Sequence, residues 1–167
     1  MTMYLNCKTY FSFKYGTYST KELVQAAADN GVTALALTNI NSTCDTWDFV
    51  QYCREAGIKP VCGAEIRNGD TLLYILLAAN NKGLTWINEF LSVHLLEKKD
   101  FPERAGETPF FNDLWDGFVV YPLGTKPLNE LFPNEQVGLL RTDLTKLYSI
   151  DWKPYSDKLV IRQPVTF

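Results

Sequence analysis

The stretch GIKPVCGAEIRNGDTLLYILLAA, residues 57–79, decides the fold. It contains two apolar runs of strand length, Lys59–Ile66 and Leu72–Ala78. The Asn68-Gly69 pair between them predicts a tight hairpin turn, because both residue types tolerate positive φ angles. We therefore expect two consecutive strands that pair directly, and the flanking segments determine what kind of sheet they join.

Two strand–helix units precede this hairpin. Their strands are expected at two short apolar runs, Tyr4–Cys7 and Thr33–Thr38. The first helix is predicted to begin at a capping box formed by Ser19 and Glu22 and to end at Gly31. The second helix is expected over Asp45–Ala56, where apolar residues recur at helical spacing.

A long helix is expected after the hairpin, over Asn80–Lys98. One of its faces is apolar and consists of Leu84, Ile87, Leu91 and Leu95. A second apolar stripe lies beside it and consists of Trp86, Phe90 and Val93. A helix that is apolar on two sides is usually buried between layers, and the alternative is an interface with another part of the protein.

The remainder of the chain is less regular. Asp100–Pro109 is charged and bracketed by prolines, which predicts a surface loop. Pro127–Phe132 is expected to form a short helix. Further strands are expected at Gly117–Tyr121, Val137–Leu140 and Lys158–Arg162. The last of these strands has no following element to cover its edge, which favours a truncated part of a larger fold.

The order of elements predicts an α/β protein. Strand, helix, strand, helix, strand, strand, helix is typical of an open sheet or barrel with mostly parallel strands. The chain of 167 residues has the length of one domain, residues 1–167, or of part of one. Its regular βα part covers about 1–98 and its less regular part about 99–167.

Composition excludes several classes of protein. The net charge of −3 argues against nonspecific binding to nucleic acid or to anionic membranes. No apolar run approaches the roughly 20 residues of a membrane span, and the N-terminus lacks the pattern of a secretory signal. The four cysteines have no CxxC spacing, and a chain with 46% apolar residues does not need disulfides, so we expect reduced thiols and a cytoplasmic location. A single histidine, His94, excludes a His-rich metal site.

Four segments resemble the motifs of PHP domains (polymerase and histidinol phosphatase). LNCKTYFSFKYG, residues 5–16, has the frame of the H-x-H motif, and ALTNINS, residues 36–42, has the frame of the T-D-H-G-N motif. GIKPVCGAEI, residues 57–66, matches G-x-x-P-x-x-G-x-E. LLYILLAANNKGLTWINEFLS, residues 72–92, resembles the segment in which a histidine precedes an apolar strand. The resemblance implies a distorted βα barrel of about seven strands, of which this chain would supply about five or six.

The resemblance also implies where a metal cluster would lie. Active PHP domains bind divalent metals such as zinc, manganese or iron through histidines and carboxylates. The positions that match these ligands carry Asn6, Lys8, Asn39, Ile40, Glu65 and, near the fourth motif, Leu73. Only the carboxylate of Glu65 is a strong ligand type, because an amide oxygen binds these metals poorly, an ammonium repels them, and Ile and Leu offer no donor atom. We therefore expect a vestigial site with no metal, no cofactor and no catalytic residue.

Within the family, the chain looks most like the N-terminal domain of bacterial replicative DNA polymerase III alpha subunits. This implies a role in DNA replication, in a parent protein that is a DNA-directed DNA polymerase, a nucleotidyltransferase. The polymerase carboxylates would lie beyond residue 167, so this chain alone would not polymerise. We expect a structural and docking module that contacts the rest of the alpha subunit and a proofreading exonuclease subunit, with DNA bound through the parent protein.

Two other functions stay open. A metal-dependent phosphoesterase or a 3′–5′ proofreading exonuclease would require bound metal. A free-standing member of the family would have no connection to replication. Whichever function applies, the exposed strand edges of an incomplete barrel favour self-association. No contact with a membrane is expected.

Several polar residues have a simpler interpretation than catalysis. Lys8 and Glu65 are expected either to form a buried ion pair or to be solvated separately. His94 lies beside an apolar helix face, where a packed structural role is the usual one. Asp45 and Asp48 fit the first turn of a helix, and Asp70 fits a turn.

Overall fold

The computed structural model describes residues 2–111 and 115–165. Its strands are β1 Met3–Cys7, β2 Ala34–Leu37, β3 Lys59–Asn68, β4 Thr71–Ala78, β5 Gly117–Pro122, β6 Glu135–Leu139, β7 Leu159–Ile161 and β8 Pro164–Val165. Its α-helices are α1 Thr20–Asp29, α2 Thr46–Glu55 and α3 Asn81–Glu97. The 3₁₀ helices are η1 Ala105–Glu107, η2 Leu128–Glu130, η3 Arg141–Asp143, η4 Lys146–Ser149 and η5 Lys153–Lys158. The expected α/β order is confirmed, with a 3₁₀ turn where a short helix was expected after Pro127.

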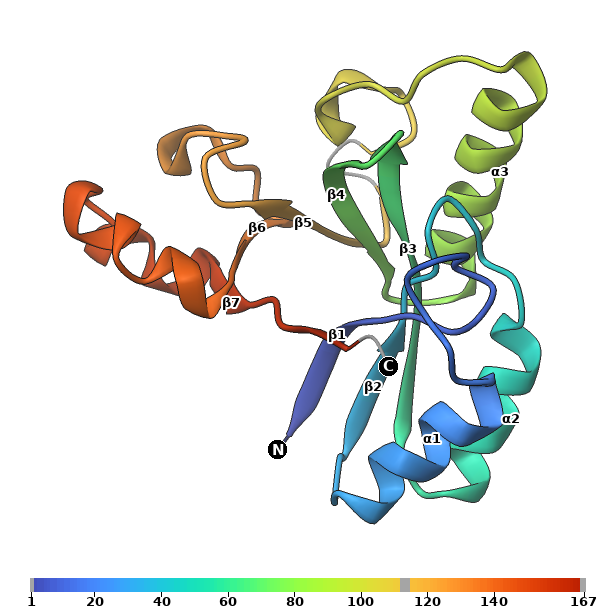
Figure 1. The fold of residues 1–167 in the computed structure, drawn as a ribbon. Coiled ribbons are helices and arrows are strands. Elements are labelled where there is room, and N and C mark those ends of the chain that lie inside the picture. Colours follow the sequence, from blue (N-terminus) through green and yellow to red (C-terminus); the bar gives the residue numbers. More distant parts are fainter. Residues whose placement is uncertain (1, 112–114, 166–167) are drawn as a thin grey trace.

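All eight strands form one mixed sheet, in the order β7-β6-β5-β4-β3-β2-β1-β8. β1 pairs in parallel with β2 and β2 with β3, and on the other side β5 pairs in parallel with β6 and β6 with β7. Between these two groups, β4 runs antiparallel to β3 and to β5. The sheet curls into a half-barrel with α1, α2 and α3 on its outside (Figure 1). The prediction of an incomplete PHP-type barrel is confirmed. The sheet has eight strands, more than the five or six expected from the resemblance. Seven of them lie at apolar runs predicted as strands, and only β8, which begins with a proline, was not predicted.

The two edges of this sheet are consecutive in the chain. β7 lies at one edge and β8 at the other, where β8 pairs in parallel with β1. Arg162 and Gln163 alone connect them, and three Cα–Cα steps span at most about 11 Å. The chain therefore crosses the opening of the half-barrel at this point, and the outer edge of β1 is covered rather than free.

The first two helices have the predicted bounds and termini. In α1, the Ser19 hydroxyl accepts the Glu22 N–H, and the Glu22 carboxylate accepts the Ser19 N–H at 2.8 Å, so the capping box is present. In α2, Asp45 occupies the N-cap position with φ 65° and makes no capping hydrogen bond through its side chain. No helix within residues 2–111 and 115–165 is long and apolar enough to cross a membrane.

The predicted hairpin is present, with its turn displaced by one residue. Asn68 still pairs with Thr71 at the end of the ladder, and Gly69 has φ 56°. The turn therefore consists of Gly69 and Asp70 rather than Asn68 and Gly69. Asn68 instead uses its side-chain amide in two hydrogen bonds with the backbone of Phe101.

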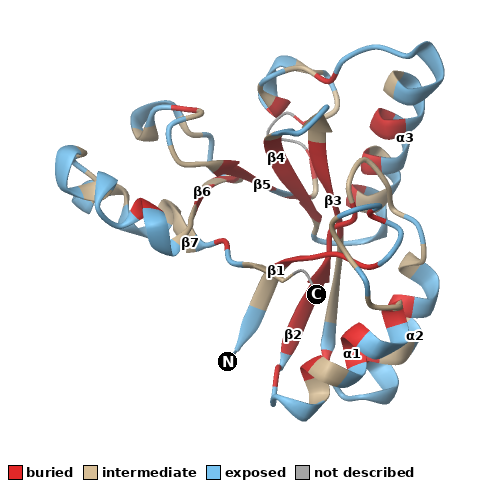
Figure 2. Cartoon of the chain, viewed as in Figure 1, coloured by how far each residue is buried: buried red, intermediate tan, exposed pale blue. Residues whose placement is uncertain are grey.

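The long helix α3 buries only part of the predicted apolar face, Ile87 and Leu91, together with Phe90 from the second stripe. Gly83, Ile87, Phe90 and Leu91 are its buried residues, whereas Leu95 is 52% exposed. The last turn of α3 projects beyond the sheet, so its apolar residues are not covered (Figure 2). Val93 is also exposed, while Trp86 is partly buried against the core.

The core is divided by the sheet. One outer cluster lies under α1 and α2, and a second lies between α3 and the strands β3, β4 and β5. A smaller cluster fills the inner face and includes Ala36, Ile75, Leu77 and Val120. The segment Asp100–Pro109 is a largely exposed loop as predicted, but Phe101 and Ala105 are buried in the second outer cluster and anchor it there.

Candidate functional site

Glu65 lies on the inner face of the half-barrel, towards the carboxyl-terminal ends of β1, β2 and β3, and its side chain is fully buried. The Lys8 ammonium is 2.7 Å from Oε2 of Glu65, and Nε of Arg67 is 2.5 Å from Oε1. The ion pair between Lys8 and Glu65 is thus confirmed, and the alternative of two separately solvated side chains is wrong. Both oxygens of the carboxylate face a cation.

Asn6 joins this cluster through its amide. Its Oδ1 accepts a hydrogen bond from Nζ of Lys8 at 2.8 Å and another from the Thr38 hydroxyl at 3.1 Å. Its Nδ2 has no partner among the described residues and is buried. The residue at this matched metal-ligand position therefore uses its oxygen to hold an ammonium group.

Asn39 and Ile40 hold the loops around the cluster. Oδ1 of Asn39 accepts hydrogen bonds from the Thr9 N–H and from the Ser12 hydroxyl, at 3.0 and 2.8 Å. The Ile40 N–H donates to the same Ser12 oxygen at 3.0 Å, and Ile40 forms a parallel bridge with Glu65. The two residues that match the second motif therefore connect loop 8–19 to β3.

Leu73 does not lie beside Glu65. The ladder between β3 and β4 shifts register after Ile66, so that Arg67 pairs with Leu72 and Leu73 is the extra residue. Leu73 packs in the outer cluster next to α3, while Leu72 packs on the inner face. The residue that corresponds to the fourth-motif histidine and lies on the same inner face as Glu65 is therefore Leu72.

Arg162 is a further cation of this region that sequence reasoning missed. It lies in the crossover between β7 and β8 and is 7% exposed. Burial lowers the pKa of its guanidinium, and the carboxylates of Glu65 and Asp143 oppose this effect. Its Nε has no hydrogen-bond partner within the described parts of the chain. No motif around Arg162 predicts this position, because Arg162 reaches the Glu65 cluster only through the placement of β7 and β8 at opposite edges of the sheet.

The electrostatics of Lys8 follow from the same packing. Burial lowers the pKa of the Lys8 ammonium, while the charge of Glu65 and its hydrogen bond act in the opposite direction. The nearby Arg67 adds to the lowering. Arg67 could have been predicted, because residues two apart on a strand point to the same face, which places it beside Glu65.

These residues do not fit a metal cluster. One carboxylate is less than the three protein ligands that a catalytic zinc requires, and both of its oxygens already face cations. Within residues 2–111 and 115–165, no three His, Cys, Asp or Glu side chains are placed to hold a metal ion. The chemistry that a metal supplies in hydrolysis therefore cannot be assigned to this site.

The other polar residues considered for catalysis make contacts of the kind that stabilise a fold. His94 bonds through Nδ1 to the Phe90 carbonyl at 2.8 Å and stacks on Phe101. Asp70 accepts a hydrogen bond from the Tyr15 hydroxyl at 3.1 Å, and Asp48 lies in the first turn of α2.

All four cysteines are free thiols. Burial raises the pKa values of Cys7 and Cys53 to about 12 and that of Cys62 to about 11. Cys44 is exposed.

A second buried carboxylate, Glu135, was not predicted. Its Oε2 accepts the Lys126 ammonium at 2.5 Å and the Phe132 N–H at 2.8 Å, and its Oε1 accepts the Tyr121 hydroxyl at 2.9 Å. The Tyr121 oxygen also accepts the Ala105 N–H at 3.1 Å. Burial and the Glu135 charge raise the pKa of Tyr121. This network joins β5 and β6 to the loop at Ala105, far along the chain from the matched motifs.

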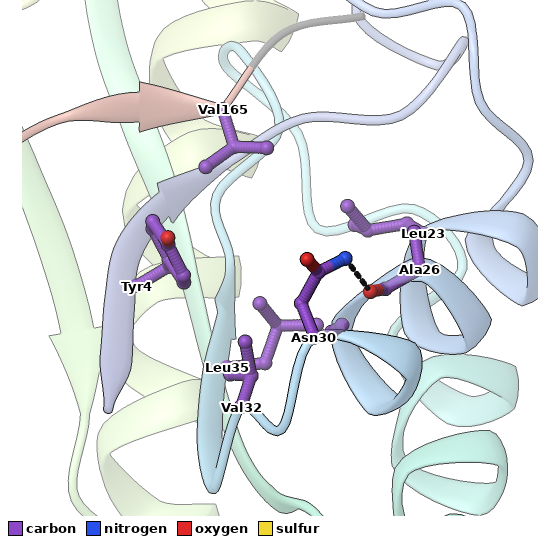
Figure 3. A pocket seen from close by; sticks show the side chains of 8 residues that line it. Tyr4, Leu23, Ala26, Asn30, Val32, Leu35 and Val165 are labelled. Atoms are coloured by element: carbon purple, nitrogen blue, oxygen red, sulfur yellow. Dashed lines mark hydrogen bonds between the residues drawn. The ribbon is translucent and has the colours of Figure 1, made fainter. Parts of the chain in front are cut away.

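A pocket of about 280 Å³ lies on the outer side, between β1 and α1 (Figure 3). Its lining is mostly apolar and includes Leu23, Leu35 and Val165. Asn30 contributes a polar side chain, but Nδ2 of Asn30 donates to the Ala26 carbonyl at 2.8 Å and so closes the end of the helix. The pocket does not contain any of the residues at the matched ligand positions.

Comparison with known proteins agrees with the arrangement of these segments. The PHP domain family matches residues 5–118. A DNA polymerase III subunit alpha from Pseudomonas aeruginosa is 34% identical over 54% of this chain and 8% of its own length. The same subunit from Haemophilus influenzae is 27% identical over 74% of this chain and 11% of its own length. The chain thus spans about a tenth of these relatives.

The fold has a counterpart among solved structures. An amidohydrolase from Chromobacterium violaceum, solved with bound sulfate and no metal, has a TM-score of 0.57 and 12% identity. The match covers 100% of this chain and 87% of that one, and it shows a shared fold. Since the family match covers most of the chain and the sheet is the corresponding half-barrel, this chain belongs to the PHP domain family.

Proposed function

We propose that this chain is the N-terminal PHP domain of a replicative DNA polymerase of the DNA polymerase III alpha type, and that it acts there as a metal-free structural and docking module. Homology to two alpha subunits over 54% and 74% of the chain supports the first part. The parent protein would extend primers in the cytoplasm during DNA replication. Its polymerase carboxylates and main DNA-binding surface would lie outside these 167 residues.

One observation carries the metal-free part of the proposal. The only carboxylate among the matched ligand positions is held by Lys8 and Arg67, whose charged groups lie where a bound metal would have to approach. A metal ion would have to displace both cations and leave the buried Lys8 without its counter-charge, which costs several kcal/mol. The cations therefore replace the metal as the partners of Glu65.

The competing function is a metal-dependent phosphoesterase or proofreading exonuclease. Elemental analysis of protein purified without chelators separates the two, because the competing function requires stoichiometric zinc, manganese or iron. We expect substoichiometric metal and no hydrolysis of DNA 3′ ends. A variant with Asn6→His, Lys8→His, Asn39→Asp and Ile40→His restores the ligand types of the family. Metal uptake by that variant alone would support the proposal, and stoichiometric metal in the unaltered chain would overturn it.

The docking part has its own test. We expect the chain to bind the purified remainder of its alpha subunit, or the proofreading exonuclease subunit of the same organism, in titration calorimetry without added metal. Failure to bind either protein would leave the domain without a docking role. Self-association through the open edge of β7 stays a prediction, and light scattering that showed only monomer at high concentration would contradict it.

A further inference from the structure

Loop 8–19, between β1 and α1, exposes three large aromatic side chains within four residues. Tyr10 and Phe11 are about half exposed, and Phe13 is 82% exposed. The rings of Tyr10 and Phe11 lie 4.7 Å apart between centroids. Contiguous exposed aromatic side chains are unfavourable in water and commonly mark a binding surface. We name these three residues the aromatic shelf.

The backbone of this loop is held firmly. The Ser12 N–H donates to the Thr9 carbonyl at 2.8 Å, and the Gly16 N–H donates to the Ser12 carbonyl at 3.1 Å. The Ser12 hydroxyl is tied to Asn39 at 2.8 Å. At Gly16, any side chain would collide with the backbone of Thr9, so the loop is also closely packed. The aromatic shelf is therefore preorganised, which lowers the entropic cost of binding to it.

Positive charge lies next to the aromatic shelf. The Arg67 guanidinium stacks over the Tyr15 ring of the same loop at 4.4 Å, and Lys14 is exposed beside Phe13. Behind Arg67, the buried Lys8 pairs with the same Glu65 carboxylate at 2.7 Å, and the buried Arg162 interacts with it electrostatically without direct contact. Among the described residues, three cations thus face one carboxylate, and two positive charges are left over.

The acidic residues nearby do not cancel this excess. Asp143 pairs with Lys146 at 2.8 Å. Asp70 accepts a hydrogen bond from the Tyr15 hydroxyl, and its one negative charge offsets only one of the two positive charges left over. Positive charge is therefore present beside the aromatic shelf, on the exposed Lys14 and the partly exposed Arg67, although the net charge of the chain is −3. Lys8 and Arg162 add to it from beneath the surface. In addition, Nε of Arg162 is a buried donor without a partner in the described parts of the chain.

From the exposed aromatic shelf and the positive charge beside it, we infer that loop 8–19 binds single-stranded nucleic acid. Bases would stack on Tyr10, Phe11 and Phe13, and phosphates would be directed to Lys14 and Arg67. Aromatic faces accept any base, and cations attract the backbone, so the binding does not depend on sequence. A duplex would bind poorly, because its base faces are covered by stacking. The interaction needs neither metal nor hydrolysis, so it goes beyond the proposed function and does not depend on it.

The test uses the 167-residue chain and a fluorescent oligothymidylate of about 12 nucleotides at low salt, followed by anisotropy. We expect Tyr10→Ala, Phe11→Ala and Phe13→Ala together to weaken binding at least about 10-fold. Lys14→Ala is expected to reduce the slope of log affinity against log salt by about 0.7. A matched control removes two exposed aromatic rings elsewhere, Trp47→Ala and Tyr148→Ala, which are 83% and 93% exposed, and should leave affinity unchanged.

Three outcomes would overturn the inference. The unaltered chain could fail to bind the oligonucleotide, the shelf variant could bind as tightly as the unaltered chain, or the control variant could lose as much affinity. A shelf variant that lost affinity only for the rest of the polymerase would assign the loop to protein docking instead. Circular dichroism and a melting curve on each variant separate loss of binding from loss of fold, and metal analysis tests the proposed function independently.

Discussion

Glu65 and Glu135 are both buried carboxylates, and their surroundings differ in charge. Glu135 is paired with one cation, Lys126, and its other hydrogen bonds come from neutral donors on Tyr121 and Phe132. Glu65 faces two cations directly, and Arg162 acts on it as a third. Within the described residues, the Glu135 cluster is therefore close to neutral, whereas the Glu65 cluster is positive.

The difference separates a cluster formed by neighbouring residues from one assembled by distant segments of the chain. The partners of Glu135 come from the same short stretch of chain, so this cluster forms along with β5 and β6. The partners of Glu65 come from β1, β3 and the last crossover, so three distant segments supply charge to one place. A buried ion pair alone is common in proteins, but an excess of charge of one sign at a barrel mouth is harder to explain by stability.

The largest expected effect comes from removing the Glu65 charge. Glu65→Gln leaves Lys8 and Arg67 without their carboxylate and removes one of the two carboxylates that act on Arg162, and we expect a loss of about 4 kcal/mol in the free energy of unfolding. Glu135→Gln leaves one cation and should cost about 3 kcal/mol. Urea denaturation of both variants measures the difference. Equal losses, or a larger loss for Glu135→Gln, would contradict the claim that the first cluster carries excess charge.

Removing a cation should reverse this order. Lys126→Met leaves Glu135 without a cation, and we expect a loss of about 3 kcal/mol. Lys8→Met leaves Glu65 paired with Arg67 and should cost only about 1 kcal/mol. The same denaturation experiment checks the pair. If Lys8→Met proved as damaging as Lys126→Met, Arg67 and Arg162 would not be compensating Glu65.

Asp143 gives a smaller, pH-dependent effect. The hydrogen bond from Lys146 lowers the pKa of Asp143 below the usual 3.8, together with the Leu140 N–H and the charges of Lys146 and Arg162. An acid whose pKa is lower in the folded state adds stability above its unfolded pKa and loses it as pH falls through the folded one. Asp143→Asn should therefore cost about 1–2 kcal/mol at pH 7, and the difference from the unaltered chain should disappear well below pH 3.8. A constant difference across acid pH would contradict this.

The smallest effect serves as a reference far from both clusters. Ser19→Ala removes the cap of α1 and should cost about 1 kcal/mol. Hydrogen bonds from Ser19 also lower the pKa of Glu22, so the contribution of the cap should fade as pH falls below 4.5. A loss near that of Glu65→Gln would mean that the chain responds to any substitution. In that case the ranking above would not report on charge.

The sequence predicts features that depend on neighbouring residues. The Ser19–Glu22 capping box and the strand positions in 57–79 depend on local spacing, and both are present. The motif frames located Glu65, Lys8 and Asn6, which the fold brings together. The period-two spacing of side chains on a strand also predicts that Arg67 lies on the same face of β3 as Glu65, although Arg67 was not among the predicted residues.

The features that were missed depend on distant parts of the chain. Arg162 reaches the Glu65 cluster only because β7 and β8 lie at opposite edges of one sheet. Leu73 lies on the outer face of the sheet because of a register shift between β3 and β4, which the β4 sequence does not reveal. The exposed end of α3 depends on how far the sheet extends beneath it, which helical periodicity cannot state.

The pairing of β1 with β8 has a consequence for biosynthesis. β1 contains residues 3–7, and its outer neighbour contains residues 164–165. At about 5–20 residues per second, the ribosome makes the second partner roughly 8–30 s after the first. During that interval β1 is open on one side, and an open strand edge is a template for the wrong partner. β1 thus waits for an outer neighbour that is made about 160 residues later, so translation speed sets the period during which a nascent chain can misassemble.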